Sequence, residues 1–250
     1  MENKILVDNL GKVFQSQNDL EINALSDLNL SVAENEFVCI LGPSGCGKST
    51  LLRIIACLEK ASCGTVFYNG REHTQPCQEI GMVFQSYSLM PWLNVLDNIA
   101  LGLEFARMPK AKRMAVAQEY LDMIGMSDFG QAFPYELSGG MQQRVAIARA
   151  LANNPDVLLM DEPFGALDAY TRILMQKELL RIWEQNRKTI LFVTHSVDEA
   201  VYLADRIILM SSSPGRIKKE IEVNIPRVRE RSNPRYGKLT TDLLSLLEEA

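Results

Sequence analysis

The sequence predicts an α/β fold in which helices cover a mostly parallel sheet. Four short apolar runs, at 37–41, 157–160, 189–193 and 207–210, have the length and composition of buried parallel strands. Helix-like stretches separate most of these runs, as in a sheet layered by helices. The composition, with 47% hydrophobic and 23% charged residues, is that of a globular chain and excludes a disordered or collagen-like one.

Two stretches depart from the buried-strand pattern. Residues 6–10 and 28–32 alternate apolar and polar side chains, which predicts an antiparallel β edge at the N-terminus. Apolar residues recur at helical spacing over 111–124, in a stretch punctuated by prolines, and this predicts an inserted helical segment.

The end of the chain completes the predicted architecture. After Gly215 we expect a short strand pair and then a helix at 233–249. The whole chain, 1–250, is then a single domain. Its predicted parts are a core of 1–88 and 154–250 and a helical subdomain of 89–153.

Charge, cysteine usage and hydropathy narrow the class of protein. The net charge of −5 argues against a nucleic-acid partner. No apolar run approaches the roughly 18 residues of a membrane-spanning helix, and the first residues lack the pattern of a signal peptide. The five cysteines are odd in number and include no C-x-x-C pair, which indicates free thiols in a reducing cytosol.

A glycine-rich segment at 42–50 fits the pattern G-x-x-x-x-G-K-[ST] between a predicted strand and a predicted helix. Glycines allow the tight turn that directs backbone N–H groups at phosphate oxygens, and the helix N-terminus adds positive potential. We expect Lys48 to reach the β- and γ-phosphates and Ser49 to bind Mg²⁺. The pattern predicts a P-loop NTPase core whose phosphate-binding residues are Gly42, Pro43, Ser44, Gly45, Cys46, Gly47, Lys48, Ser49 and Thr50.

Two carboxylates follow the predicted strand at 157–160. Ligands in open α/β sheets bind where strands end. Asp161 is therefore expected to hold Mg²⁺, directly or through water, and Glu162 to act as the general base for the attacking water. Taken alone, an acidic strand-to-loop turn explains these two residues equally well.

Residues 137–144 read Leu-Ser-Gly-Gly-Met-Gln-Gln-Arg and open a predicted helix that Asn154 and Pro155 stop. The N-terminus of this helix is a second anion site. Beside the P-loop, the segment resembles the signature motif of the ATP-binding-cassette (ABC) ATPases, and the resemblance covers nearly the whole chain. It implies ATP and Mg²⁺ as cofactors, ATP hydrolysis as the activity, and nucleotide contacts by Ser138, Gly139, Gly140 and Gln142.

The resemblance implies roles for four further residues. Gln85 is similar to the Q-loop glutamine, a ligand of Mg²⁺ and water. Asp168, in the segment Ala166-Leu167-Asp168, is similar to the D-loop residue that meets the opposing subunit. His195 is similar to the switch histidine that contacts the γ-phosphate. Phe14 is similar to the aromatic residue that stacks on adenine; a phenylalanine of a small edge-strand core is the alternative.

The chain departs from the family pattern at two turns. Asn35 stands where relatives usually have glycine before the P-loop strand, and asparagine tolerates the positive φ that such a turn needs. Ser196 stands where an aspartate commonly follows the histidine, and with Glu199 it predicts a capping box for the next helix. Neither change removes a residue of ATP hydrolysis.

The family pattern also implies partners. Two chains pair head to tail, so that each ATP lies between the P-loop of one chain and Ser138 and Gly140 of the other. The partner is a second copy of the chain or a paralogous ATPase. Separate transmembrane permease subunits and, indirectly, a substrate-binding protein are also implied, with this chain peripheral on the cytoplasmic face of the inner membrane. The expected permease contact is 86–92, whose apolar side chains would also suit a core.

Within the family the chain is most similar to the ATP-binding proteins of nitrate/sulfonate/taurine-type importers, on residues 91–99, 161–169 and 213–217. That similarity implies import of a small anion or sulfonate-like nutrient. One alternative is a non-transport ABC-class ATPase of DNA repair or chromosome structure, although the sequence has no long coiled-coil or zinc insert. The other is a regulatory ATP-binding module, which would be expected to lack a working Lys48, Glu162 or His195.

Two local features carry predictions of their own. Cys46 lies at the predicted helix N-terminus, which favours a reactive thiolate that ATP would protect. Between 215 and 235 the chain carries seven Lys or Arg and three Glu. This segment is either a solvated face or a contact surface for an acidic partner, made by Arg227, Arg229 and Arg231.

Overall fold

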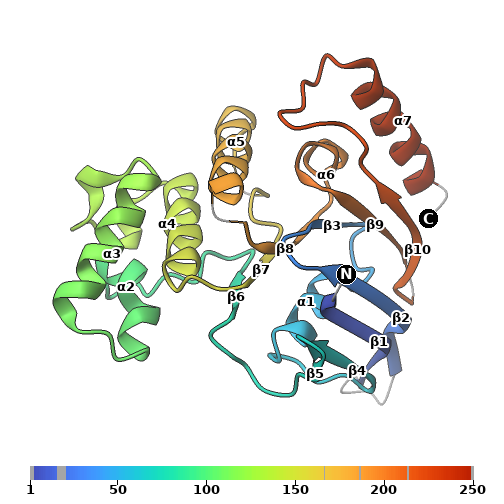
Figure 1. The fold of residues 1–250 in the computed structure, drawn as a ribbon, viewed down its shortest axis with the longest axis horizontal. Helices are drawn as coiled ribbons and strands as arrows, with labels where there is room; N and C mark the ends of the chain where they lie inside the picture. The colour runs from blue at the N-terminus through green and yellow to red at the C-terminus, as the bar shows by residue number, and fades with distance from the viewer. Residues whose placement is uncertain (1–2, 16–20, 166, 186, 213, 249–250) are drawn as a thin grey trace. The chain divides into compact units, whose positions relative to one another are not determined.

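The structure is a computed structural model, and it describes residues 3–15, 21–165, 167–185, 187–212 and 214–248 (Figure 1). The chain divides into two compact units. The first unit comprises 1–77 and 187–250, and the second comprises 78–186. The domain boundaries expected from the sequence, with a helical subdomain at 89–153, stay a prediction.

The first unit contains two groups of strands. An antiparallel sheet has the order β2-β1-β4-β5, which confirms the predicted antiparallel edge. In the other group β3 lies parallel to both β8 and β9, and β9 pairs with β10 in antiparallel fashion. The elements of this unit are β1 (Asn3–Gln15), β2 (Glu21–Ala33), β3 (Phe37–Leu41), α1 (Lys48–Ile55), β4 (Cys63–Tyr68), β5 (Arg71–Glu72), β8 (Thr189–Thr194), α6 (Val197–Leu203), β9 (Arg206–Ser211), β10 (Arg216–Glu222) and α7 (Pro234–Glu248).

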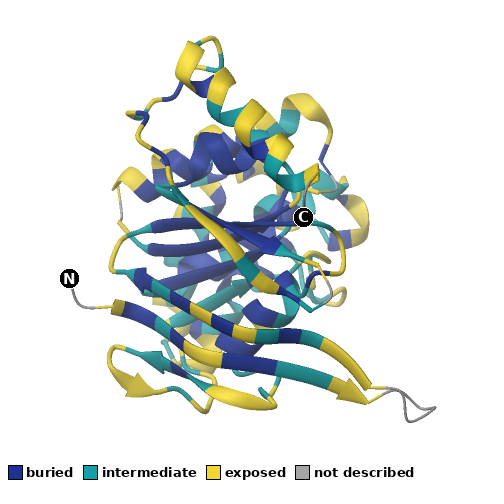
Figure 2. Ribbon diagram, turned by 90° about the vertical axis from the view of Figure 1, so that its right-hand side faces the viewer, coloured by how far each residue is buried: buried dark blue, intermediate teal, exposed yellow. Residues whose placement is uncertain are grey.

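The parallel strands form the apolar centre of the first unit. Every residue of β3 and β8 is buried, and β9 is buried at its four central positions (Figure 2). Strands covered on both faces carry continuous runs of Val, Ile and Leu rather than an alternating pattern. The strands predicted at 37–41, 189–193 and 207–210 are therefore confirmed.

The turn before β3 confirms the prediction for Asn35. This residue has a φ of +61°, and its N–H donates a hydrogen bond of 3.0 Å to Oγ1 of Thr189. Asparagine adopts this left-handed region more readily than most residues. The turn thus links the start of β3 to the start of its parallel neighbour β8. The five cysteines are free thiols, as predicted.

The tail of the chain differs from the prediction in two ways. After Gly215 the described residues contain one strand, β10, rather than a strand pair, and Pro226 lacks the N–H that a second ladder would need. The basic segment 215–235 is a solvated face at Arg216, Lys218, Lys219 and Arg235, which are exposed, whereas the three arginines proposed to meet an acidic partner, Arg227, Arg229 and Arg231, bind groups of this chain instead. Arg229 is 4% exposed, and all three side chains bind groups of α6 or the residues beside it.

The second unit consists of a parallel strand pair and a group of helices. The strand β6 lies parallel to β7, and the helices share a core in which Val95, Ile99, Leu121 and Val145 are fully buried. The predicted strand at 157–160 and helix at 111–124 are confirmed. The elements are β6 (Ile80–Val83), α2 (Val95–Phe105), α3 (Lys110–Met123), η1 (Ser127–Phe129), η2 (Pro134–Glu136), α4 (Gly139–Ala152), β7 (Val157–Asp161) and α5 (Ala169–Gln185).

Among the residues that the structure describes, we find no helix with the length and apolar character needed to cross a bilayer.

Candidate active site

The loop between β3 and α1 is curled around the side chain of Lys48. The ammonium group donates to the carbonyl oxygens of Gly42 at 2.8 Å and Pro43 at 2.9 Å, and the residue is 5% exposed. Gly47 has a φ of +93°, and a Cβ there would lie 2.6 Å from the side chain of Leu25, so the position requires glycine. No side chain caps α1 and its first turn holds no acidic residue, so its positive end suits a phosphate.

Cys46 corrects one prediction. The thiol is 1% exposed, and burial raises its pKa even though Lys48 lies 3.8 Å from the sulfur and acts in the opposite direction. Burial and the raised pKa argue against the predicted reactive thiolate, and its protection by ATP stays a prediction. Removal of the thiolate from water raises the pKa by more than the charge of Lys48 and the hydrogen bonds to the sulfur lower it.

His195 lies beside the start of the P-loop. In the parallel pair β3–β8, Leu41 is opposite Thr194. The next residues, Gly42 and His195, therefore leave two neighbouring strands at the same end, where strands are about 4.8 Å apart. The side chain of His195 is exposed. The structure thus brings the predicted switch histidine and the phosphate loop together within the first unit.

Phe14 lies towards the end of the β1–β2 hairpin. Lys12 pairs with Leu25, whose side chain lies against Gly47 of the P-loop. Phe14 lies two residues further along β1, opposite Ile22. The ring is 36% exposed, and the ammonium of Lys12 is 4.6 Å from its centroid. This exposure argues against the alternative of an edge-strand core. The adenine contact stays a prediction.

In the second unit, the ends of β6 and β7 bring two predicted residues together. Val83 is opposite Met160, and Gln85 and Glu162 each follow two residues later. The amide nitrogen of Gln85 donates to Oε2 of Glu162 at 3.3 Å. The backbone of Glu162 has a φ of +45°, which is uncommon for a residue other than glycine and is concentrated at functional sites. Asp161, at the end of β7, is 2% exposed.

The signature segment begins α4. The hydroxyl of Ser138 accepts the N–H of Met141 at 3.3 Å, so Ser138 is the N-cap of the helix. A Cβ at Gly139 would lie 2.8 Å from the hydroxyl of Tyr87, and glycine therefore permits a close approach of that residue. The side chain of Gln142 donates to the carbonyl oxygens of Pro134 and Leu137, so it holds the preceding turn.

The D-loop residues lie against the signature segment. A Cβ at Gly140 would contact the side chains of Leu167 and Thr171, each at 3.4 Å. Asp168 is exposed and caps α5, and hydrogen bonds from Thr171 lower the pKa of its carboxyl. Ala166, also assigned to this loop, lies outside the described residues.

Two residues that support the site were not predicted from the sequence. Asn98 is fully buried in α2, and its amide donates to the carbonyl oxygens of Met90 and Leu93. Arg149 of α4 donates to the carbonyl oxygens of Tyr87 at 3.1 Å and Ser88 at 2.7 Å, and burial lowers its pKa. Both side chains hold the segment that follows Gln85. The signal available in the sequence was a polar residue among apolar ones, for Arg149 within the predicted helix that 137–144 opens and for Asn98 in a stretch where no separate helix was predicted.

The residues predicted to bind Mg²⁺ supply a suitable donor set. Ser49 offers a hydroxyl oxygen, Asp161 a carboxylate on a buried strand end, and Gln85 an amide oxygen. Magnesium prefers oxygen ligands and is commonly held by one or two carboxylates together with phosphates.

Comparison with known proteins identifies the family. The ABC transporter family model matches residues 25–165. An uncharacterized ABC transporter ATP-binding protein of Methanocaldococcus jannaschii is 49% identical to this chain, and the aligned region covers 100% of this chain and 93% of that protein. The taurine import ATP-binding protein of Rhizobium johnstonii is 46% identical, over 97% of this chain and 93% of its own. The solved dimeric structure of a bacterial ABC transporter cassette has a TM-score of 0.81 and 37% identity, over 89% of this chain and 100% of the cassette.

The chain therefore belongs to the ABC transporter family. Within it, the chain is an ATP-binding subunit, an ABC ATPase, as the P-loop and signature motif predicted. Its relatives include taurine, sulfonate and nitrate import ATP-binding proteins, so the predicted resemblance to that group is confirmed.

Proposed function

We propose that this chain hydrolyses ATP as part of an importer, as one of two copies, or of two paralogues, that close around two Mg²⁺-ATP. One observation carries the proposal: the chain retains the hydrolytic residues in an ordered arrangement. Lys48 is enclosed by its loop, His195 begins beside that loop, and Gln85 holds Glu162. A regulatory module that only binds ATP would have no need of this set.

The proposed roles follow from charge and geometry. Lys48 and the N-terminus of α1 neutralise the β- and γ-phosphates. Ser49, Asp161 and Gln85 would hold Mg²⁺, which neutralises negative charge on the phosphate oxygens when it is bound. Glu162 takes the proton of the attacking water, and the hydrogen bond from Gln85 keeps its carboxylate oriented. His195 contacts the γ-phosphate.

The partner chain completes each nucleotide site. The N-terminus of α4, with Ser138, Gly139 and Gly140, meets the γ-phosphate of the ATP on the opposite P-loop. Asp168 lies at the same interface, and Phe14 stacks on the adenine. The solved bacterial cassette is dimeric, which supports this arrangement.

The permease and the cargo come from the relatives. The segment 86–92 is the proposed contact for a membrane-spanning permease, since Trp92 is 71% exposed and can be covered by a partner. The related import proteins are named for taurine, sulfonates and nitrate, which share an oxoanion group. We therefore propose a small oxoanion as the cargo, delivered by a substrate-binding protein to a permease on whose cytoplasmic side this chain lies.

The substitution Glu162→Gln tests the catalytic assignment. It keeps the shape of the side chain but removes the group that takes a proton, so hydrolysis should fall by about 10²–10⁴-fold. The affinity for Mg²⁺-ATP should stay within about twofold, because Lys48, Ser49 and Asp161 remain. The matched control is Glu184→Gln on the exposed side of α5, which should hydrolyse ATP like the wild type. Near wild-type turnover in Glu162→Gln would contradict the assignment.

Co-purification tests the transport role. The tagged Glu162→Gln chain, extracted from membranes of its own cells with Mg²⁺-ATP present, should retain a protein with several membrane-spanning helices. If no membrane-spanning protein is retained and DNA stimulates ATP hydrolysis, the result would instead support the DNA-repair class of ABC ATPase.

A further inference from the structure

His195 is the single residue between the end of β8 and the N-cap of α6. Thr194 ends the strand, and Ser196 caps the helix by accepting the N–H of Glu199 at 3.3 Å. The position of His195 therefore depends in part on what holds Thr194 on one side and the first turn of α6 on the other.

The strand side of this turn is held internally. Thr194 is 2% exposed, and its hydroxyl lies 2.5 Å from Oε2 of Glu199, which is 4% exposed. The N–H of Ser196, which a complete capping box would pair with Glu199, donates to Oγ1 of Thr194 at 3.0 Å. Only the serine half of the predicted capping box is therefore seen, and Glu199 ties the helix to the strand.

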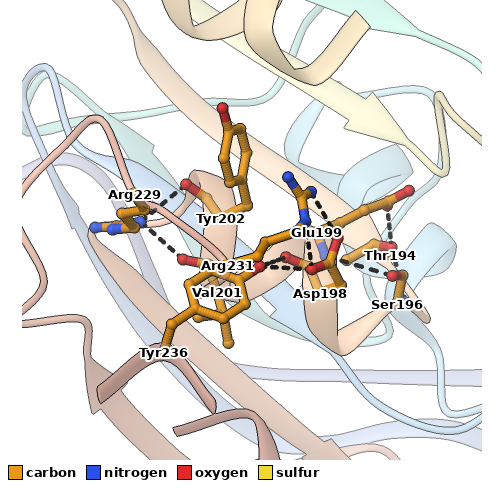
Figure 3. Close-up of polar contacts among 9 residues, drawn as sticks. All are labelled: Thr194, Ser196, Asp198, Glu199, Val201, Tyr202, Arg229, Arg231 and Tyr236. Atoms are coloured by element: carbon orange, nitrogen blue, oxygen red, sulfur yellow. Dashed lines mark hydrogen bonds and ion pairs between the residues drawn. The ribbon is translucent and has the colours of Figure 1, made fainter. Parts of the chain in front are cut away.

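The helix side is held by a distant part of the chain, residues 223–236, which we call the C-terminal strap (Figure 3). Arg231 donates to both carboxylate oxygens of Asp198, from Nε to Oδ1 at 2.8 Å and from Nη2 to Oδ2 at 2.7 Å. The hydroxyl of Tyr236 lies 2.6 Å from Oδ1 of the same carboxylate. Paired hydrogen bonds between a guanidinium and a carboxylate are strong and directional.

The strap also holds the other end of α6. Arg229 donates from Nη1 to the carbonyl oxygens of Val201 at 3.0 Å and Tyr202 at 3.1 Å. Arg227 donates to the carbonyl oxygen of Leu203 at 2.5 Å. Cations are favourable at the carboxyl end of a helix, where carbonyl groups lack helical partners. The strap thus contacts both ends of a helix of seven residues, six of which are buried.

These charges persist at neutral pH. Burial lowers the pKa of Arg229 to about 10, so its guanidinium remains charged near pH 7. The hydrogen bond to Asp198 raises the pKa of Arg231. Burial, and then the contact with Asp198, raise the pKa of Tyr236 well above its usual range, so its hydroxyl keeps the proton that it donates.

We propose that Asp198 is a positioning residue for His195, and that the strap, through Arg231 and Tyr236, sets where α6 begins and how the histidine is presented. This rests on the proposed function, in which His195 contacts the γ-phosphate. A seven-residue helix has little stability of its own, so loss of the strap contacts displaces His195. The P-loop is unaffected, because Lys48 is held by the loop itself.

The substitution Arg231→Met tests the proposal in the full-length chain. It removes both hydrogen bonds to Asp198 and keeps an extended side chain. With Mg²⁺-ATP, kcat should fall about tenfold or more, since a misplacement of about 1 Å costs on the order of 10²-fold, while KM for ATP stays within about twofold. Arg231→Lys keeps the charge without the planar fork and should recover part of the loss. The control is Arg216→Met, whose exposed ion pair with Asp27 at 3.4 Å contributes little.

The same substitution made in the His195→Ala variant distinguishes a role in positioning His195 from a general loss of structure. In His195→Ala the imidazole is gone, so adding Arg231→Met should lower the single-turnover rate no further. Equal losses with and without the histidine would overturn the proposal, and so would wild-type kcat in Arg231→Met. Wild-type turnover in His195→Ala would instead overturn the proposed role of the histidine. If Arg231→Met is too unstable to assay, Tyr236→Phe enters the same comparison, with a smaller loss that also disappears in His195→Ala.

Discussion

The P-loop and the loop that carries His195 leave neighbouring parallel strands, yet they are held by different kinds of contact. The P-loop is held locally, by the hydrogen bonds of Lys48 to carbonyl groups five and six residues earlier. The first turn of α6, by contrast, is held both by its neighbour Thr194 and by Arg231 and Tyr236, which lie 33 and 38 residues from Asp198. The hydrogen bonds of Lys48 are therefore local in the sequence, although the P-loop also packs against Leu25 and Met210, whereas the switch loop combines local hydrogen bonds with contacts from the end of the chain.

The largest expected effect comes from a substitution in the P-loop, which is the locally held loop of the two. Lys48→Ala removes the cation that the phosphates meet, and the affinity for Mg²⁺-ATP should fall by about 10²-fold or more, as expected for loss of a buried charge pair. A fluorescent ATP analogue titrated against the protein measures it. Lys60→Ala, at an exposed position of the same unit, is the control and should bind like the wild type. An affinity within about threefold of wild type in Lys48→Ala would contradict the assignment.

The next largest effect comes from a substitution in the C-terminal strap, which makes the long-range contacts with α6. Arg229→Met leaves the carbonyl groups of Val201 and Tyr202 without their buried donor. The free energy of unfolding should fall by about 2 kcal/mol, which lowers Tm by about 4–8 °C for a chain of this size. ATP affinity should not change, because the P-loop is held separately. Arg216→Met is the control in the same thermal melts and should have the Tm of the wild type. An unchanged Tm in Arg229→Met would show that the contacts of the strap do not stabilise the fold.

A smaller effect is expected at the cap of the switch helix. Ser196→Ala removes the hydroxyl that accepts the N–H of Glu199, and loss of such a cap costs about 1 kcal/mol. The decrease in Tm should be about 2–4 °C. Asn94→Ala, which removes the comparable cap of α2 in the second unit, should cost a similar amount. A much larger loss in Ser196→Ala would mean that the hydroxyl does more than cap α6.

The smallest effect concerns thiol chemistry. Burial raises the pKa of Cys46, so its thiolate fraction at pH 7 is reduced and alkylation should be slow. Cys63 is exposed and should react first. Peptide mass spectrometry after timed exposure to a maleimide gives the two rates, and Cys46→Ser identifies the peptide. Faster labelling at Cys46 than at Cys63 would contradict the burial.

The same comparison explains what the sequence could and could not predict. The P-loop, the buried strands around it and the positive φ of Asn35 follow from short stretches of residues, because each depends on local backbone geometry. The adjacency of Gln85 and Glu162 follows from two strand ends and the family pattern.

Contacts made over long stretches of chain left no such signal. The basic residues between 215 and 235 had the pattern of a charged surface, and only the fold shows that Arg229 is buried against α6. The position of Cys46 favoured a thiolate, and the packing around it reversed that expectation. Helical periodicity likewise cannot show that Asn98 holds a loop through its amide.

Two inactive variants, mixed, test the central claim that each ATP is bound by residues of two chains. Lys48→Ala lacks a working P-loop, and Ser138→Arg blocks the second anion site with a bulky side chain. Each should hydrolyse ATP poorly alone. In an equimolar mixture, half of the dimers pair the intact P-loop of one chain with the intact signature segment of the other, so about a quarter of wild-type hydrolysis should return if pairing is random. A mixture no more active than the sum of the separate variants would contradict the head-to-tail arrangement.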